Sequence, residues 1–304
     1  MSNKRLTGEP AYDKLASEHF GGWELLQGMI YLKAFKISER KIPNTNVYPY
    51  NVFLNKECDW MIFEPITVLY GNNASGKSTL LNIIANKLKV TGAERGGDFN
   101  PGFSTFIEEC DFILGERDNG KPVSVLPEHS RYIKSEDVMY VVKKIQQEAI
   151  LKECYLFQKA AEGIGEEAVK RYADSYELKK RMEIMLFNQE KYSNGETSLQ
   201  VMEDSIYPDS LYLLDEPEMS LSPQNQVLLA EKINEAARYL SCQFIVATHS
   251  PIMLGTLQGK ILNLETKEIG VCRWTDLENV RFFYEFFKRN EEKFKKEAED
   301  PDLL

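Results

Sequence analysis

Hydrophobic positions along the chain predict a layered α/β fold. Three short runs, at residues 66–70, 211–215 and 244–248, are almost wholly apolar, and the last two end in polar residues. Runs of this length and composition are typical of strands that are buried on both faces of a parallel sheet. We therefore expect these three segments to form the core of a parallel sheet.

A second group of strands is expected ahead of that core. Residues 28–37, 51–54 and 60–63 have strand composition, and a Pro- and Asn-rich loop at 42–50 separates the first from the others. These segments predict an antiparallel β layer. Beyond residue 79, apolar residues recur at helical spacing and predict a helix; they are Leu80, Leu81, Ile83, Ile84 and Leu88.

The pattern changes twice more along the chain, which divides it into predicted regions. We expect an N-terminal arm at 1–27, an α/β domain at 28–124 and 191–270, an inserted helical subdomain at 125–190, and a helical tail at 271–304. The tail carries four aromatic residues at helical spacing. We interpret it as a helix packed on its own domain, with a docking surface for a partner as the alternative; the residues are Phe282, Phe283, Phe286 and Phe287.

Charge and cysteine content narrow the functional classes. The 37 Lys and Arg against 47 Asp and Glu give a net charge of −10, so nucleic acid is a conceivable partner that the charge balance does not support. Five scattered cysteines without C-x-x-C spacing are typical of reduced thiols. With no signal peptide and no apolar run of membrane-spanning length, we expect a cytoplasmic protein that does not enter a membrane.

The segment after the 66–70 run carries a phosphate-binding motif. It reads G-x-x-x-x-G-K-S between a predicted strand and a predicted helix, which is the context that a P-loop requires. Its backbone N–H groups and the helix N-terminus favour anions. We expect Lys77 to reach the β- and γ-phosphates of ATP and Ser78 to place its hydroxyl on Mg²⁺. The predicted nucleotide-binding residues are Gly71, Asn72, Asn73, Ala74, Ser75, Gly76, Lys77, Ser78 and Thr79.

Polar residues at the ends of the other two runs complete a predicted site. Asp215 ends one run and is expected to coordinate Mg²⁺, while Glu216 would activate the attacking water. His249 follows the other run and is expected beside the γ-phosphate, because ligands bind at the carboxyl ends of strands in open α/β sheets. Aromatic residues 48, 50 and 53 are either an adenine-stacking surface or ordinary core and surface residues; they are Tyr48, Tyr50 and Phe53.

These motifs, in this order, resemble those of ABC-type ATPases. The P-loop resembles Walker A, Tyr192-Ser193-Asn194-Gly195-Glu196 resembles the ABC signature, residues 211–216 resemble Walker B with its catalytic glutamate, and Ala247-Thr248-His249 resembles the switch-histidine segment. The run D-E-P-E-M-S-L-S-P at 215–223 is similar to that of small defence and repair ATPases. The chain thus resembles the soluble, non-transporter branch that includes the SMC, RecF and OLD families.

The sequence departs from that family pattern in two places. Tyr192 and Asn194 replace the commoner Leu and Gly of the signature. No glutamine Q-loop is visible, and Glu136 resembles the acidic position that some soluble members use there to hold the metal. The alternative for Glu136 is an ordinary acidic residue behind the helix-capping Ser135.

The resemblance implies a mechanism and partners. Two copies would meet head to tail as a homodimer, with Ser193, Gly195 and Glu196 of one copy facing the ATP held by the other. The resemblance implies ATP and Mg²⁺ as ligands and ATP hydrolysis as the activity. The catalytic residues would be Glu216, His249 and Lys77. The metal ligands would be Ser78, Asp215 and Glu136. We expect a switch that acts on a separate effector protein in defence or DNA repair. A transporter ATPase subunit and a slow-turnover scaffold that restrains an effector are the alternatives.

Overall fold

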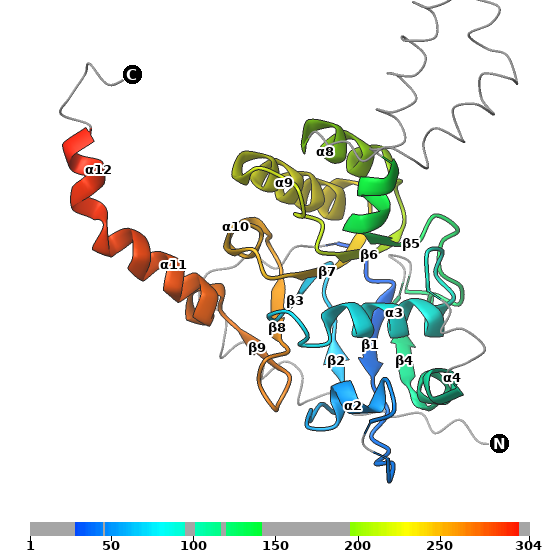
Figure 1. The fold of residues 1–304 in the computed structure, drawn as a ribbon. Helices are drawn as coiled ribbons and strands as arrows, with labels where there is room; N and C mark the ends of the chain where they lie inside the picture. Colours follow the sequence, from blue (N-terminus) through cyan, green and yellow to red (C-terminus); the bar gives the residue numbers. More distant parts are fainter. Residues whose placement is uncertain (1–27, 45, 95–100, 117–119, 142–194, 298–304) are drawn as a thin grey trace, which may run out of the picture.

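Two β-sheets with different strand directions form the centre of the molecule (Figure 1). The computed structural model describes residues 28–44, 46–94, 101–116, 120–141 and 195–297. Within these residues a six-stranded sheet has the order β5-β6-β7-β3-β8-β9, and a three-stranded sheet has the order β2-β1-β4. The expected α/β architecture, with a parallel core sheet and an antiparallel β layer, is confirmed.

The core sheet is parallel across its first five strands. β3 (Ile66–Tyr70) pairs with β7 (Gln243–Thr248) on one side and with β8 (Lys260–Asn263) on the other. β6 (Leu211–Asp215) lies between β7 and β5 (Arg131–Lys134). Every residue of β3, β6 and β7 is buried, as the apolar runs predicted.

One short strand closes the edge of the core sheet next to β8. β9 (Gly270–Cys272) pairs antiparallel with β8, so the sheet is parallel except at this edge. The turn between them is held by Lys56, whose Nζ donates to the carbonyl of Leu264 at 2.5 Å. The turn contacts the P-loop, because the carboxylate of Glu265 accepts the backbone N–H of Asn72.

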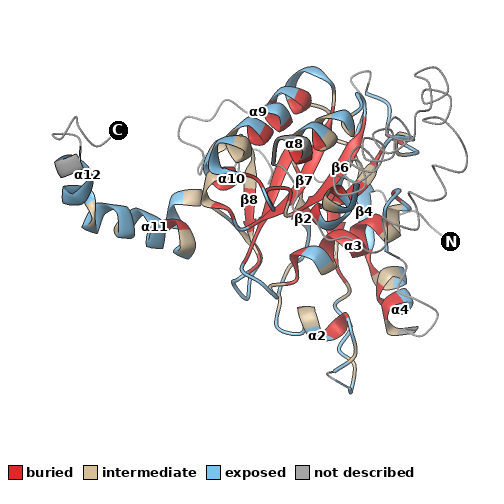
Figure 2. Cartoon of the chain, turned by 45° about the horizontal axis from the view of Figure 1, so that its top comes forward, coloured by how far each residue is buried: buried red, intermediate tan, exposed pale blue. Residues whose placement is uncertain are grey.

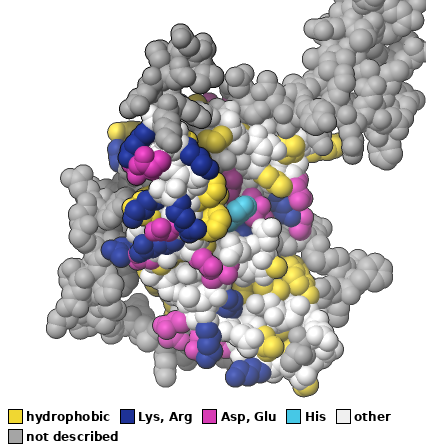
Figure 3. Space-filling view, turned by 60° about the vertical axis from the view of Figure 1, so that its left-hand side comes forward, with side chains coloured by type: hydrophobic (Ala, Val, Ile, Leu, Met, Phe, Trp, Pro, Cys, Tyr) yellow, Lys and Arg dark blue, Asp and Glu magenta, His cyan; other side chains and the backbone are white. Residues whose placement is uncertain are grey.

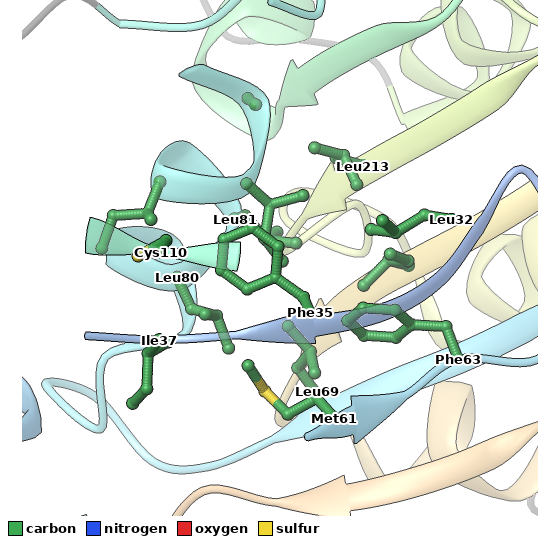
Figure 4. Close-up of a cluster of buried hydrophobic side chains, with 14 of the residues drawn as sticks. Leu32, Phe35, Ile37, Met61, Phe63, Leu69, Leu80, Leu81, Cys110 and Leu213 are labelled. Atoms are coloured by element: carbon green, nitrogen blue, oxygen red, sulfur yellow. The ribbon is translucent and has the colours of Figure 1, made fainter. Parts of the chain in front are cut away.

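Alternate residues of the buried strands face two separate hydrophobic clusters. Leu69, Leu213 and Ile245 point toward the antiparallel layer and α3 (Lys77–Leu88). Figure 4 shows this first cluster, in which Phe35, Phe63, Leu80 and Leu81 meet Leu69 and Leu213. The second cluster lies on the other face of the sheet and includes Val68, Tyr212, Leu214, Phe244 and Val246.

A buried glutamine helps to join the antiparallel layer to the core sheet. The layer consists of β1 (Leu32–Lys36), β2 (Met61–Ile62) and β4 (Asp111–Leu114). The side-chain oxygen of Gln243 accepts the N–H groups of Tyr31 and Leu32 at 2.8 Å, and its amide donates to the carbonyl of Leu32 at 2.8 Å. Because a buried amide is costly unless its hydrogen bonds are made, this residue fixes the two sheets to each other.

One predicted strand of this layer is wrong. Residues 51–54 do not form a strand; they belong mainly to a short helix, α2 (Tyr50–Phe53). Tyr50 and Phe53 are three residues apart and so lie on one helical face, where both rings pack against Phe106 of α4 (Pro101–Glu109). A four-residue apolar segment does not distinguish a strand from a buried helical turn, and tertiary packing decided it.

Helices cover both faces of the core sheet. Figure 2 shows the buried strands beside α9, whose outer surface is exposed. On the face opposite the antiparallel layer lie α8 (Gly195–Asp204), α9 (Pro223–Tyr239) and α10 (Pro251–Thr256). The N-cap of α9 is the hydroxyl of Ser222, which accepts the N–H of Asn225.

The beginning of the predicted insert is part of the core sheet. β5 falls within the interval 125–190 and pairs with β6 along its length. Residues 135–141 are helical. Residues 142–194 lie outside the described residues, so the inserted helical subdomain and the domain boundaries stay predictions.

The C-terminal tail extends away from the body of the molecule (Figure 1). A 3-10 turn, η1 (Trp274–Asp276), leads into α11 (Glu278–Arg289) and then α12 (Glu291–Glu297). Val280 is the buried residue of α11, and the four predicted aromatic residues are all exposed. The first turn of α11 packs on the domain through Val280, but the interpretation of the four aromatic residues as packed on their own domain is wrong.

Candidate functional site: the phosphate-binding edge of the core sheet

The P-loop joins the end of β3 to the start of α3. Ala74 and Gly76 have positive φ values of 66° and 96°, which turn the backbone back toward the sheet. A side chain at Gly76 would be strained at this φ and would place a Cβ 2.7 Å from Val52 Cγ1. At Gly71, a Cβ would lie 2.3 Å from Ser75 Oγ, so both motif glycines are required by the tight path of the loop.

Lys77 is held by the loop that it follows. Its buried Nζ donates to the carbonyls of Gly71 at 2.7 Å and of Asn72 at 3.2 Å. The same Nζ lies 3.4 Å from Oε1 of Glu216. These contacts hold the ammonium group at the mouth of the loop, where an anionic ligand would meet it.

Ser78 and Asp215 meet where α3 begins and β6 ends. Ser78 Oγ donates to Asp215 Oδ1 at 3.0 Å, and the hydroxyl of Tyr132 donates to Oδ2 at 3.1 Å. Burial raises the pKa of the Asp215 carboxyl, although these two hydrogen bonds oppose the shift. The pKa of Tyr132 is also raised, first by burial and then by the nearby charge of Asp215, so this hydroxyl stays a donor.

Glu216 and His249 lie side by side at the ends of neighbouring strands. The backbone N–H of Glu216 donates to the carbonyl of Ala247 at 2.9 Å, and its φ is 47°. A positive φ in a non-glycine residue costs free energy and is often found at functional sites. His249 Nδ1 lies 3.4 Å from Glu216 Oε1, and 47% of the His249 side chain is exposed.

A pocket of about 350 Å³ brings most of the predicted residues together. From the P-loop it is lined by the whole segment 73–79. Asp215 and Glu216 line it from the end of β6, and Glu136 lines it from the helical residues after β5. Gly71 and Asn72 contribute through their carbonyls, which hold Lys77.

The signature residues are described only in part. Ser193 lies outside the described residues. Gly195 begins α8 and Glu196 follows it in that helix. Their predicted contact with a nucleotide in another copy stays a prediction.

The aromatic candidates for adenine stacking separate into two groups. Tyr50 and Phe53 are buried core residues, and the Tyr50 hydroxyl donates to Glu109 at 2.9 Å. Burial and this contact raise the pKa of Tyr50 to about 12. Tyr48 is partly exposed, stacks on Phe103, and has its hydroxyl 3.4 Å from Thr79 Oγ1 at the start of α3. Of the three, Tyr48 is the one that is exposed beside the P-loop helix, because the Phe53 ring lies next to Gly76 but is buried.

Several residues of the site did not follow from sequence patterns. Tyr132 and Lys134 belong to β5, a four-residue strand in a segment predicted to be helical; Lys134 lines the pocket and pairs with Glu94. Glu218 is a buried carboxyl that accepts the hydroxyl of Thr248, and burial raises its pKa. Its place in the D-E-P-E run, next to Asp215 and Glu216, could have identified it as a residue of the site. Glu265 gave no such signal, because it reaches Asn72 across 193 residues of sequence.

The donor set fits a magnesium ion that is shared with phosphate. Among the described residues, no cluster of three or more His, Cys, Asp or Glu side chains could hold a metal alone. Mg²⁺ is usually bound by one or two carboxylates together with substrate phosphates and water. Ser78 and Asp215, with Glu136 in the same pocket, are a set of that kind.

One protein family model matches part of the chain. Residues 180–254 match the model described as an AAA ATPase domain. The match covers about a quarter of the chain and includes β6, β7 and His249 but not the P-loop. No curated protein sequence matches the chain.

Solved structures with a similar arrangement are ATP-binding cassettes. One is a protein named as a cobalt transport ATP-binding protein, with 17% identity, coverage of 81% of each chain and a TM-score of 0.35. CbiO1 from Clostridium perfringens, part of the ABC transporter complex CbiONQ, has 14% identity, coverage of 89% of this chain and 100% of its own, and a TM-score of 0.39.

A third similar structure is a nucleotide-free ATP-binding cassette from an ABC transporter. It has 14% identity, coverage of 84% of this chain and 99% of its own, and a TM-score of 0.40. Similarity at this level carries no inference about transport. Among the described residues, no helix is both long and apolar enough to cross a membrane. The loop between β3 and α3 lies beside the acids that end β6, a strand separated from β3 by β7 in the same parallel sheet, and this arrangement gives the chain the fold of a P-loop NTPase.

Proposed function

We propose that the protein binds and hydrolyses ATP with Mg²⁺ and uses the nucleotide to control assembly with a second copy of itself. The observation that carries the proposal is one pocket lined by Lys77, Ser78, Asp215 and Glu216. These residues come from two segments more than 130 residues apart, so their meeting is a property of the fold. The match to an ATPase domain model over β6 and β7 supports the same activity.

Lys77 and the P-loop amides would bind the β- and γ-phosphates. The first N–H groups of α3 have no helical acceptor, and the helix dipole adds partial positive charge to them. Phosphate oxygens would take Lys77 from its loop carbonyls and from Glu216. This exchange would release the Glu216 carboxylate for a water molecule at the moment when ATP is in place.

Glu216 would accept the proton of the attacking water. Its backbone is fixed to β7 through Ala247, which anchors the residue at the end of β6. His249 lies beside Glu216 with its side chain partly exposed, and it would contact the γ-phosphate or the water. Mg²⁺, held by Ser78 and Asp215, would neutralise phosphate charge. Its positive charge would also offset the burial of the Asp215 carboxylate.

The second part of the proposal concerns assembly. By resemblance to ABC-type ATPases, Ser193 and Gly195 of one copy would contact the ATP held by another, so ATP would hold two copies together and hydrolysis would release them. A separate effector protein in defence or DNA repair would respond to this ATP-dependent change in assembly.

The proposal is tested by the solution mass of Glu216→Gln with and without Mg·ATP, measured by light scattering behind a sizing column. We expect ATP to increase the assembly size of Glu216→Gln and a further Ser193→Arg substitution to abolish the increase. Glu231→Gln, the same change at an exposed position of α9, is the matched control and should behave as wild type. An ATP-dependent increase that persists with Ser193→Arg would contradict composite sites.

A further inference from the structure

Five phenylalanines of the tail share one exposed helical face. Their spacing of one, four, five and twelve residues from the first member places them on the same side of α11 and α12. Ring contacts between Phe287 and Phe294, with centroids 6.3 Å apart, continue this face across the junction of the two helices. The exposed fractions are Phe282 65%, Phe283 45%, Phe286 50%, Phe287 53% and Phe294 57%.

An exposed face of this kind is rare on a molecule that works alone. A fully buried Phe covers roughly 200 Å², so the exposed parts of these five rings amount to about 500 Å² of apolar surface. Contiguous patches of that size on soluble proteins usually mark an interaction site. Figure 3, turned to bring this side forward, shows hydrophobic side chains beside a surface of mixed Lys, Arg, Asp and Glu.

We propose that this aromatic face pairs with the same face of a second copy of the chain, with the two α11 helices antiparallel. This interface goes beyond the proposed ATP-controlled contact, because it uses a different surface and needs no nucleotide. Two copies of the face would remove about 1,000 Å² from water through the phenylalanines alone. Flanking residues would bring the total toward the 1,200–2,000 Å² of stable interfaces.

The charges along one edge of the face make it complementary to itself. Glu278, Glu285, Arg289 and Lys293 are spaced by seven, four and four residues, so they form one row beside Phe282 and Phe286. The row is acidic in its N-terminal half and basic in its C-terminal half. In an antiparallel pair related by a twofold axis, the same edge of each helix meets its counterpart with direction reversed. The acidic half of one copy then lies beside the basic half of the other.

A register centred on Phe287 places Glu285 of each copy opposite Arg289 of the other. The antiparallel arrangement also sets the N-terminal dipole end of each helix beside the C-terminal end of its partner, which is favourable. A parallel pair would lose both features. Self-complementarity of this kind is the reason for assigning the face to a second copy of the chain.

The test is the solution mass of the full chain in EDTA without nucleotide, over a range of concentrations. We expect a mass near twice the 35.0 kDa of one chain. The double variant Phe286→Glu with Phe287→Glu should be a monomer with an unchanged circular dichroism spectrum, because both rings are exposed and their replacement removes no core contact. Arg281→Glu, a charge reversal on the opposite face of α11, is the matched control and should remain a dimer.

A charge exchange tests the antiparallel register. Glu285→Arg alone and Arg289→Glu alone should each weaken the dimer about three- to tenfold, since each creates two like-charge contacts. The two changes together should restore wild-type affinity. A wild-type monomer at all concentrations would overturn the proposal, and so would a monomer that sediments with anionic lipid vesicles. Dimerisation with no rescue by the double exchange would overturn the antiparallel register.

The two assembly proposals can fail separately. Lys77→Ala removes the P-loop cation and should abolish any ATP-dependent increase in mass, but it should leave the nucleotide-free dimer unchanged. Loss of the nucleotide-free dimer in Lys77→Ala would contradict an independent interface. A nucleotide-free dimer in a protein that never responds to ATP would support the α11 pairing and contradict the proposed switch.

Discussion

The phosphate edge of the core sheet and the aromatic face of the tail both depart from the usual placement of side chains, in opposite ways. At the phosphate edge, Lys77 and Asp215 are charged and buried, and each is held by hydrogen bonds from its own chain. On the tail, aromatic side chains are exposed, and neighbouring rings contact one another. Burying charged groups and exposing apolar surface to water both raise the free energy of the folded protein. The contrast suggests that both regions are completed by something outside the chain.

The largest expected effect lies at the phosphate edge. Glu216→Gln should lower the rate of ATP hydrolysis about 10²- to 10⁴-fold, because general bases contribute that much to proton-transfer steps. ATP binding should be kept, since Lys77 and the P-loop are unchanged. The measurement is steady-state phosphate release alongside a binding titration.

The matched control for that experiment is again Glu231→Gln, which should keep the wild-type rate. If Glu216→Gln hydrolyses ATP as fast as the control, the carboxylate is not the base. The nearby Glu218 and the slow-turnover scaffold would then have to be considered.

The next largest effect is the change in the free energy of unfolding when one side chain is truncated in each region. Leu213→Ala removes a fully buried side chain between β6 and the antiparallel layer and should lower the free energy of unfolding by about 2–5 kcal/mol. Phe287→Ala removes a larger side chain from an exposed face. In the Phe286→Glu background, in which dimerisation is weakened, it should change stability by less than about 0.5 kcal/mol. Urea unfolding monitored by circular dichroism provides both values.

A large destabilisation by Phe287→Ala in that background would mean that the tail packs on its own chain after all. The contrast between the two regions would then be lost.

The smallest expected effect concerns the cost of the buried Asp215 carboxylate. Its pKa is raised in the folded protein, so its ionised form lowers stability at neutral pH, and this cost appears as the pH rises through the folded pKa. In EDTA, Asp215→Asn should therefore melt at a higher temperature than wild type at pH 7. The difference should shrink as the pH falls toward the ordinary value of 3.8.

With Mg·ATP the order should reverse, because only the wild-type carboxylate can help to hold the metal. Thermal melts of both proteins at several pH values check this prediction. A lower melting temperature for Asp215→Asn in EDTA would show that the hydrogen bonds from Ser78 and Tyr132 outweigh the cost of burial.

The sequence was most informative where chemistry and local structure coincide. The P-loop could be located because its glycines, its lysine and the flanking elements all depend on neighbours in the sequence. The ends of β6 and β7 were predictable for the same reason, since continuous apolar runs mark buried parallel strands. The fold class followed from these three segments.

Long-range contacts and short elements were the parts that the sequence did not show. β5 is four residues long and its strand character depends on its pairing with β6, so Tyr132 and Lys134 were missed. Residues 50–53 are helical because two rings pack on α4, a contact that no local pattern encodes. The tail was predicted to be helical, but periodicity says which residues share a face and not what covers that face.

The hydrogen bond between Asn279 and His249 couples the orientation of the tail to the end of β7. Asn279 in the first turn of α11 donates from Nδ2 to the backbone carbonyl of His249 at 2.5 Å, so the root of the tail is attached to the residue that follows β7. Helices α11 and α12 together span residues 278–297. Stacked end to end they reach about 30 Å, and a rotation of about 10° at the root would carry the far end about 5 Å. A backbone adjustment at the end of β7 that is too small to disturb the sheet would therefore be magnified several-fold at the far end of the tail.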